Sequence, residues 1–183
     1  MAGIEPPDDS EALDDLGREL RERFGHEMRE EAELVEQDAA TVELRRRGIA
    51  DVATELVSRG DIVTVIAGDR SVHGRLVFAR GEMASVEAAV GRVDVHLSAG
   101  VALRVDERST EGGAAPRRGS DTLRARLLEL ELSGTAIEVW VPTHAIEVRG
   151  AIIAVGTDHV LIRDRDANEW ALLFYDIAWV RGA

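Results

Sequence analysis

The sequence has no cysteine and no lysine, and its apolar residues never form a long unbroken run. Without cysteine there are no disulfides and no thiolate metal sites, and nothing in the chain demands an oxidising compartment. No apolar stretch approaches the roughly 18 residues that a membrane-spanning helix needs. The first residues are acidic and lack the apolar segment of a secretion signal. These absences predict a cytoplasmic protein with no membrane partner.

The sequence also lacks the short motifs that mark common catalytic and cofactor sites. It contains no G-x-G-x-x-G, no P-loop, no G-x-S-x-G and no H-E-x-x-H. Its five histidines stand at no spacing typical of a metal site. The nearest pairs, Asp94 with His96 and Asp158 with His159, are more typical of ordinary surface residues. We therefore expect no enzyme activity, no metal and no cofactor.

The net charge of −13 is concentrated at the N-terminus. Residues 1–47 carry a charge of −8, residues 48–110 carry −2 and residues 111–183 carry −3. A phosphate backbone is bound largely by Lys and Arg side chains, so this balance disfavours a nucleic-acid binder. Local arginine groups keep an RNA- or DNA-binding regulator open as the alternative function. Its candidate contacts are Arg45, Arg46, Arg47, Arg80, Arg117 and Arg118.

The N-terminal segment has the pattern of an acidic helix. Residues 1–10, with two prolines and several acids, are predicted to be disordered. Residues 11–47 form a predicted amphipathic arm, because apolar residues recur at three- and four-residue steps from Leu13 onward. Such a narrow apolar stripe must pack on a partner helix or on the rest of the chain. The arm is predicted to end at Gly48, since glycine suits the left-handed end of a helix.

Two sets of five short strands follow, each behind a short helix. In residues 48–106 a helix precedes apolar alternation that predicts strands, and Gly74 in the second strand predicts a sharp bend. Residues 107–120 are polar and glycine-rich, which is typical of a linker. In residues 121–183 a helix capped by Ser120 precedes the second set. Five strands with a bent second strand indicate a small, strongly curved barrel.

The two sets are copies of one another. From Val72 onward a shift of 76 residues aligns them without a gap, so that Gly74 meets Gly150 and Leu97 meets Leu173. Upstream of the first hairpin the shift is 74, which makes the second copy's hairpin two residues longer. We therefore expect a mainly β fold with a helical N-terminus and two tandem five-stranded barrels, each preceded by a short helix.

This unit resembles the Sm-like family, which includes the bacterial Hfq proteins. The match lies in the order of a helix, V-x-V, a turn, G-x-hydrophobic, a third strand and a short closing strand, as in VTVIAGDRSVHGRLVFARGEMASV. A looser likeness is to actinobacterial proteins with a helical N-terminus and paired barrels. The resemblance implies two Sm-like barrels, which commonly associate edge to edge through their strands.

The family's RNA site is not implied, because the positions that carry it differ. Family members that grip RNA usually have an Asp and an Asn where this chain has Arg80 and Ala84 in the first copy, and Gly156 and Val160 in the second. The Lys-His pair of the Hfq uridine pocket has no counterpart, since Phe174 and Tyr175 occupy that region. No residue of this chain therefore inherits a functional role.

Aromatic residues are few, and five of the seven lie in the second copy. In the segment EWALLFY, residues 169–175, side chains alternate and both faces of the predicted strand are apolar. Three explanations fit: helix 121–132 covers the outer face, a subunit or partner protein binds there, or nucleic-acid bases stack on it. The candidate interface residues are Trp140, Trp170, Leu172, Phe174, Tyr175 and Trp179. We expect a non-catalytic interaction and assembly module that binds a protein partner or associates with itself.

Overall fold

A computed structural model describes residues 41–110, 112–113 and 118–182 of the chain. The chain divides into two compact units, residues 1–47 and residues 48–183. In the first unit residues 41–46 are helical, whereas the predicted disordered segment 1–10 and most of the predicted arm lie outside the described residues. Gly48 does not adopt the predicted left-handed conformation. Its φ is −78°, because it is the N-cap of the next helix, and its N–H donates to Asp51 at 2.8 Å.

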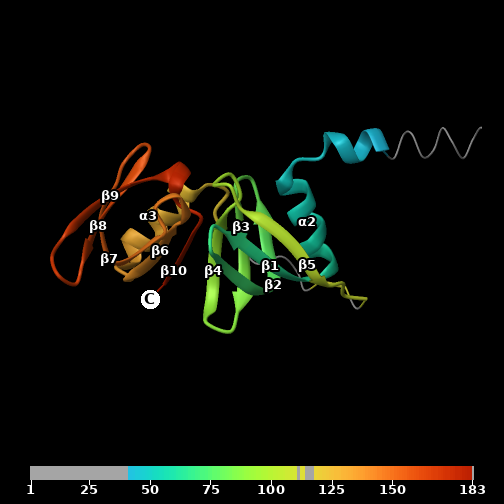
Figure 1. Ribbon diagram of the computed structural model, residues 1–183, viewed down its shortest axis with the longest axis horizontal. Helices are drawn as coiled ribbons and strands as arrows, with labels where there is room; N and C mark the ends of the chain where they lie inside the picture. The colour runs from blue at the N-terminus through green and yellow to red at the C-terminus, as the bar shows by residue number, and fades with distance from the viewer. Residues whose placement is uncertain (1–40, 111, 114–117, 183) are drawn as a thin grey trace, which may run out of the picture. The chain divides into compact units, whose positions relative to one another are not determined.

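The second unit begins with a repeat of one helix and five antiparallel strands (Figure 1). Its elements are α2 (Ile49–Arg59), β1 (Ile62–Ala67), β2 (Arg70–Arg80), β3 (Met83–Ala88), β4 (Gly91–His96) and β5 (Ala102–Glu107). Helix α2 ends at Gly60, whose left-handed φ of 78° lets its N–H bond back to the last turn. Gly74 lets β2 bend closely over β3, because a Cβ there would lie 2.2 Å from the Glu87 carbonyl oxygen.

The second repeat has the same succession of a helix and five strands. Its elements are α3 (Leu123–Ser133), β6 (Ile137–Val141), η1 (Pro142–His144), β7 (Ile146–Val155), β8 (His159–Asp164), β9 (Glu169–Leu173), η2 (Phe174–Asp176) and β10 (Trp179–Gly182). Thr122, not the predicted Ser120, caps α3, and its hydroxyl accepts a hydrogen bond from the Ala125 N–H at 3.1 Å. The predicted strand 169–175 is too long, because its last two residues form the short turn η2.

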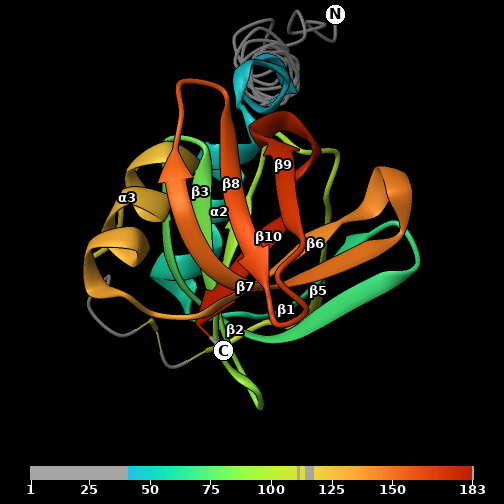
Figure 2. The ribbon, with the colours of Figure 1, turned by 90° about the vertical axis from the view of Figure 1, so that its left-hand side faces the viewer.

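All ten strands belong to one open antiparallel sheet, in the order β5-β1-β2-β3-β4-β10-β6-β7-β8-β9. Each repeat contributes five neighbouring strands in the same internal order. Figure 2 looks onto the second repeat, with α3 beside its strands. The expectation of two tandem five-stranded barrels is not confirmed, because the ten strands of the described residues form one open sheet in which β4 pairs with β10 of the other repeat and not with β5 of its own.

Strand pairing defines which residues of the two repeats are equivalent. Val63 pairs with Gly74 and Ile137 pairs with Gly150, so the predicted shifts of 74 and 76 residues hold for the first two strands. The second strand also carries a register shift at the same place in both repeats, beginning at Leu76 and at the equivalent Ile152. The duplication therefore extends to local irregularities of the backbone.

The gapless alignment is wrong after the third strand. Met83 pairs with His96, whereas the equivalent His159 pairs with Leu173. Leu173 therefore corresponds to His96 and not to Leu97, because the turn between the third and fourth strands is one residue longer in the second repeat. From this turn onward, equivalent residues are 77 positions apart.

Two buried clusters hold the second unit together, and each one crosses the boundary between the repeats. The cluster around Val65 in the first repeat includes Trp140 and Trp179 from the second. The cluster in the second repeat includes Phe78 and Met83 from the first. Since each repeat completes the core of the other, burial of apolar surface joins them into one compact unit.

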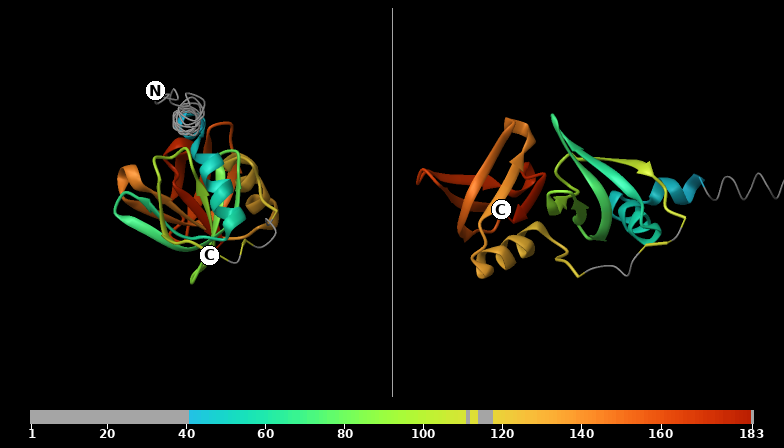
Figure 3. Two further views of the ribbon diagram at one scale, coloured as in Figure 1. Left: turned by 90° about the vertical axis from the view of Figure 1, so that its right-hand side faces the viewer. Right: turned by 90° about the horizontal axis from the view of Figure 1, so that it is seen from below.

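The predicted linker 107–120 begins inside β5, which includes Glu107, and its residues Gly112 and Gly113 lie against the end of α2. Figure 3 shows α2 beside the first repeat and α3 beside the second. The Ser109 N–H donates to the buried Asp61 carboxylate at 2.9 Å, and the Gly113 N–H donates to the Ser58 carbonyl at 2.8 Å. A Cβ at Gly113 would lie 2.1 Å from the Val57 carbonyl oxygen, so only glycine fits this approach. The linker is therefore anchored to the first repeat.

Candidate assembly interface

The two repeats meet where β4 pairs with β10, and we call this contact the internal joint. Trp179 lies opposite Val95 in the pairing. The His96 N–H donates to the Ala178 carbonyl oxygen at 2.8 Å, which extends the ladder by one bond. The fourth strand of one repeat thus accepts the fifth strand of the other along its backbone edge.

Two of the candidate interface aromatics fill the internal joint. Trp140 and Trp179 stack with ring centroids 6.2 Å apart, and both are buried. The Trp140 indole N–H donates to the Ala67 carbonyl oxygen at 2.9 Å, and the Arg70 guanidinium lies 4.2 Å from the centre of the Trp140 ring. These side chains therefore connect the second repeat to β1 and β2 of the first.

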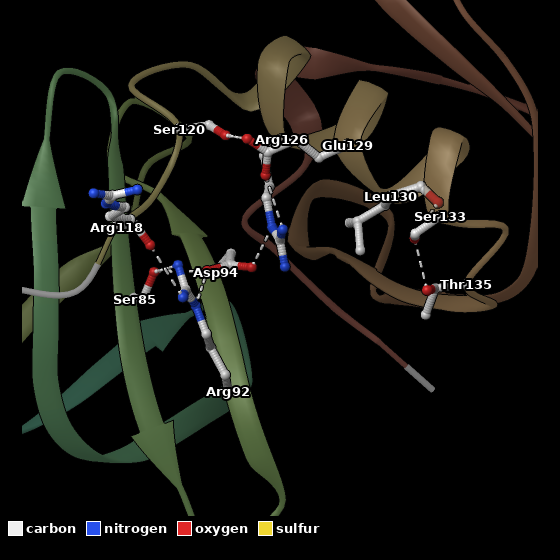
Figure 4. A network of polar contacts seen from close by, with 10 residues as sticks. All are labelled: Ser85, Arg92, Asp94, Arg118, Ser120, Arg126, Glu129, Leu130, Ser133 and Thr135. Atoms are coloured by element: carbon white, nitrogen blue, oxygen red, sulfur yellow. Dashed lines mark hydrogen bonds and ion pairs between the residues drawn. The ribbon is translucent and has the colours of Figure 1, made fainter.

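Asp94 is the polar centre of the internal joint (Figure 4). Its carboxylate is 2% exposed and accepts hydrogen bonds from Ser85 at 2.6 Å and from Arg92 at 2.9 Å. Arg126 of α3 reaches across the boundary and donates to the second carboxylate oxygen at 2.6 Å. A buried carboxylate is expensive unless it is paired, and here all three partners are in place.

The Arg126 guanidinium links this network to the surface of α3. Burial alone would lower its pKa, but the negative charges of Asp94 and Glu129 raise it above the ordinary arginine value. Glu129 accepts from Arg126 at 3.0 Å and from the Ser120 hydroxyl. The Ser120 hydrogen bond and the Arg126 charge lower the pKa of Glu129. Both shifts favour the charged forms of Arg126 and Glu129 at neutral pH.

The two faces of β9 are not equivalent. Leu172 is buried and Trp170 and Phe174 pack against the same cluster, whereas Leu173 is 37% exposed and Tyr175 is 67% exposed. Helix α3 packs chiefly against β7, and the exposure of Leu173 and Tyr175 shows that it leaves their side of this segment uncovered. The candidate interface residues thus fall into three groups: the joint, the core and the exposed surface.

Strands β5 and β9 stand at the two ends of the sheet order, so within the described part of the chain each pairs on one side only. We call their unpaired sides the free edges. Each of these two strands carries an exposed apolar side chain: Val105 of β5 and Leu173 of β9 are each 37% exposed. On α2, Ile49 is 44% and Val52 is 38% exposed. Apolar surface therefore accompanies both free edges.

The structure places the arginines predicted as nucleic-acid contacts in different parts of the chain. Arg80 forms an ion pair with Asp121 at 3.2 Å, and the Arg118 carbonyl oxygen accepts a hydrogen bond from Arg92 at 3.4 Å. Arg117 lies outside the described residues. Arg45 and Arg46 belong to the helix of the first unit, and Arg47 follows it directly.

The sequence did not identify Asp94 and Arg126 as partners. Asp94 alternates with valines along a predicted strand, which is typical of a polar outer face. Its partner lies on a helix 32 residues later, and no local pattern signals that contact. A comparison of the repeats with the corrected shift gives the only available sign, since Asp94 is replaced by Ala171 at the free edge.

The described residues define a mainly β protein whose two repeats, each with its own helix, share one ten-stranded sheet. Comparison of the sequence with protein-family models and with curated proteins finds no match. Among the described helices, none is long and apolar enough to cross a membrane. In the same part of the chain, no three His, Asp or Glu side chains come together as a possible metal site.

Proposed function

We propose that the protein is a non-catalytic assembly module in which β9 of one molecule pairs with β5 of a second copy. The observation that carries this proposal is the internal joint, where the fourth strand of one repeat pairs with the fifth strand of the other. Strands β9 and β5 are the remaining fourth and fifth strands, and both have a free edge in the described sheet. Unpaired strand edges are ready sites for pairing with another chain.

The internal joint also predicts the register of this contact. It places Trp179 opposite Val95. By strand pairing, the equivalent of Trp179 is Ala102 and the equivalent of Val95 is Leu172. We therefore expect Leu172 of one molecule to lie opposite Ala102 of the next. Because the two surfaces differ, repetition of this contact gives a closed ring or an open chain.

Side chains near the free edges support a contact of different chemistry from the internal joint. The ion pair between Arg126 and Asp94 corresponds to Val52 on α2 and Ala171 on β9. Likewise Ser85, which donates to Asp94, corresponds to Leu161. An apolar helix face would thus meet an apolar strand face, with no charge to bury.

The ends of the two helices support the same arrangement. At the internal joint the Leu123 N–H, at the start of α3, donates to the Glu82 carboxylate at 2.8 Å. Glu82 corresponds to Asp158, and Leu123 corresponds to Ile49 at the start of α2. An acid therefore stands where it can accept the first N–H of α2 from a second copy. Leu123 is fully buried whereas Ile49 is 44% exposed, as expected for a site that awaits its partner.

Light scattering on the full-length chain tests the proposal. At tens of micromolar we expect a particle mass that is a multiple of the 19.9 kDa chain. Ala171→Asp places an unpaired charge against Val52 and lowers the mass toward that of the monomer. Adding Val52→Arg recreates the pair of the internal joint and restores assembly. Leu132→Asp, on an 88% exposed residue of α3, is the matched control and leaves the mass unchanged.

Two results would contradict the proposal: a wild-type monomer across this concentration range, or a Val52→Arg change that fails to restore the assembly of the Ala171→Asp variant.

The rival function, a nucleic-acid-binding regulator, is tested on the same samples. It requires binding of RNA or duplex DNA that weakens steeply between about 50 and 200 mM salt. Such binding by a monomeric chain would replace the assembly proposal.

We further propose that the two repeats are Sm-like units and that the protein works in the cytoplasm. The shared strand order, the matching register shift in the second strand and the preceding helix support the first statement. The lack of cysteine supports the second. A protease-protection and fractionation experiment on intact cells tests the location, and recovery of the chain outside the cytoplasm would overturn it.

A further inference from the structure

A hollow of about 520 Å³ lies on the second repeat, and no residue of the edge strands β5 and β9 lines it. Small residues line part of it, namely Ala136 just before β6, Gly150 and Ala151 of β7, and Gly182 of β10. The bend of β7 at Gly150 brings that strand close to β8, since a Cβ there would lie 2.1 Å from the Arg163 carbonyl oxygen. Val90, from the turn between β3 and β4, completes the apolar part of the lining. Ligand sites commonly have about 300–1,000 Å³ of space, so the hollow has the size of a small-molecule site.

Four arginines line this hollow together with two acids, and we call it the arginine hollow. They are Arg149 of β7, Arg163 of β8, Arg165 of the turn after β8 and Arg181 of β10, and the acids are Glu138 and Asp164. The lining thus holds two more arginines than acids, and Glu147 and Glu169, just outside it, pair with Arg149 and Arg163 and balance the charge. Four guanidinium groups around one hollow of a chain that carries −13 are the first indication of an anionic ligand.

The first repeat does not have this set of charges. Arg149 corresponds to His73, Arg163 to Glu87 and Arg181 to Arg104. Of these three arginines, only Arg181 has an arginine at the equivalent position of the first repeat. The other two positions hold a histidine and a glutamate there. The arginine hollow is therefore a property of the second repeat and not a requirement of the shared fold.

Neither lining acid forms an ion pair with Arg163 or Arg165, whereas Arg149 also pairs with Glu147 outside the lining. Glu138 is 7% exposed and is shared between Arg149 and Arg181, each at 2.6 Å. The Asp164 carboxylate accepts instead from Asn168 and from the Trp170 indole N–H, and these bonds lower its pKa. It therefore stays ionised without forming an ion pair with an arginine of the hollow.

Arg163 and Arg165 are open to a ligand and hold no buried carboxylate. Arg163 makes one ion pair, with Glu169, and both side chains are more than half exposed. Arg165 has no ion-pair partner among the described residues. Each guanidinium carries five N–H donors in a planar fork that matches the oxygens of a carboxylate or phosphate. Donors from two adjacent side chains can thus converge on a single anionic group.

We propose that the arginine hollow binds a small molecule that carries a phosphate monoester, of about the size of a mononucleotide. A phosphate monoester carries about −1.5 to −2 charges at neutral pH and several acceptor oxygens, which the exposed guanidinium groups of Arg163 and Arg165 can meet with charge-assisted hydrogen bonds. The uncharged part of such a ligand has the apolar surface of Val90, Ala136 and Ala151 to contact. This site differs from the assembly surface of β5 and β9, since no residue of those strands lines it.

Calorimetric titration of the full-length chain tests the proposal, with inorganic phosphate and adenosine monophosphate as probes at constant ionic strength. We expect saturable binding of both, tighter for the nucleotide. The Arg163→Ala/Arg165→Ala variant weakens binding at least about tenfold, because each lost guanidinium removes charge-assisted hydrogen bonds. These two residues are chosen because Arg149 and Arg181 hold the buried Glu138, and their loss would disturb the fold.

The matched control is Arg80→Ala/Arg124→Ala, which removes the same charge outside the hollow. Equal weakening in the control would reduce the effect to net charge and overturn the assignment, as would a wild-type chain that does not saturate. A single-stranded oligonucleotide without terminal phosphates provides the last arm. We expect it not to displace adenosine monophosphate, and effective displacement would assign the hollow to a nucleic-acid backbone instead. Far-ultraviolet circular dichroism confirms that each variant is folded.

Discussion

The internal joint and the free edges use equivalent strands but different side chains. At the internal joint β4 and β10 meet around the buried Asp94 and its arginines, whereas the equivalent place on β9 holds Ala171. If β9 of one molecule met β10 of another, Arg126 would lose its carboxylate partner and face an apolar strand. Unpaired charges of this kind reject the wrong partner more strongly than good contacts attract the right one. In the proposed assembly, divergence of the repeats would thus give each strand edge one preferred neighbour.

The largest effect is expected from Trp179→Ala. This side chain is 6% exposed, stacks on Trp140 and belongs to the cluster that joins the repeats. Its removal leaves a cavity at the joint and should lower the free energy of unfolding by about 3–5 kcal/mol. Urea denaturation followed by circular dichroism measures the change without relying on tryptophan fluorescence.

Tyr175→Ala is the control for this change on the free-edge side. Tyr175 is 67% exposed, so its removal should change the free energy of unfolding by less than about 0.5 kcal/mol. Similar losses for the two variants would mean that the joint contributes no more than the surface does, and the comparison between the two regions would fail.

The next largest effect is expected from Asp94→Ala. It leaves Arg92 and Arg126 without their shared carboxylate, which should lower the free energy of unfolding by about 2–4 kcal/mol. Arg126→Met alone leaves the buried carboxylate with two of its three partners. A double-mutant cycle with these two changes should give a coupling energy of about 1–3 kcal/mol, which urea denaturation of the four proteins measures.

Ala171→Ser tests the equivalent position at the free edge. It should shift the free energy of unfolding by less than about 0.5 kcal/mol, because its surroundings are exposed in the single chain. Additive effects of Asp94→Ala and Arg126→Met would show that the ion pair does not couple the repeats. The chemical contrast between the two regions would then have no energetic consequence.

The strands and the duplication were readable from the sequence because the local pattern and the final structure agree. Alternating apolar residues, Gly74 and the equivalent Gly150 mark the same bent second strand in both repeats. The alignment failed at the turn after β8, where Ala167 takes a left-handed φ of 61°. Glycine usually marks such a conformation in a sequence, and alanine does not, so the sequence does not reveal the extra residue of this turn.

The pairing of β4 with β10 was beyond the reach of sequence patterns for a different reason. Backbone edges carry no residue code, and any strand offers the same donors and acceptors. The aromatic pair Trp140 and Trp179 was identified as an interface, but the sequence did not indicate that the interface lies within one chain. The residues that contact Trp140, namely Ala67 and Arg70, lie about seventy positions earlier in the chain. Only tertiary structure brings these residues together.

The smallest expected effect is on how stability depends on pH, and it tests whether the carboxylates at the internal joint differ from those near the free edges. Burial would raise the pKa of Glu147, but hydrogen bonds from Arg70 and Arg149 lower it below the ordinary glutamate value. The Ser120 hydrogen bond and Arg126 likewise lower the pKa of Glu129. Both carboxylates help to link the repeats, since Glu147 pairs with Arg70 of β2 and Glu129 supports Arg126.

Because each pKa is lower in the folded chain than in the unfolded chain, folding favours the ionised carboxylates. Their contribution is therefore fully present above the unfolded value of about 4.3 and is lost as pH falls through the folded values. We expect urea midpoints to be flat from neutral pH down to about pH 5 and to fall below it. Glu147→Gln should make this decline shallower, whereas Glu169→Gln, at the exposed edge strand β9, should leave it unchanged. A decline that is identical in all three proteins would assign the acid sensitivity to carboxylates outside the joint.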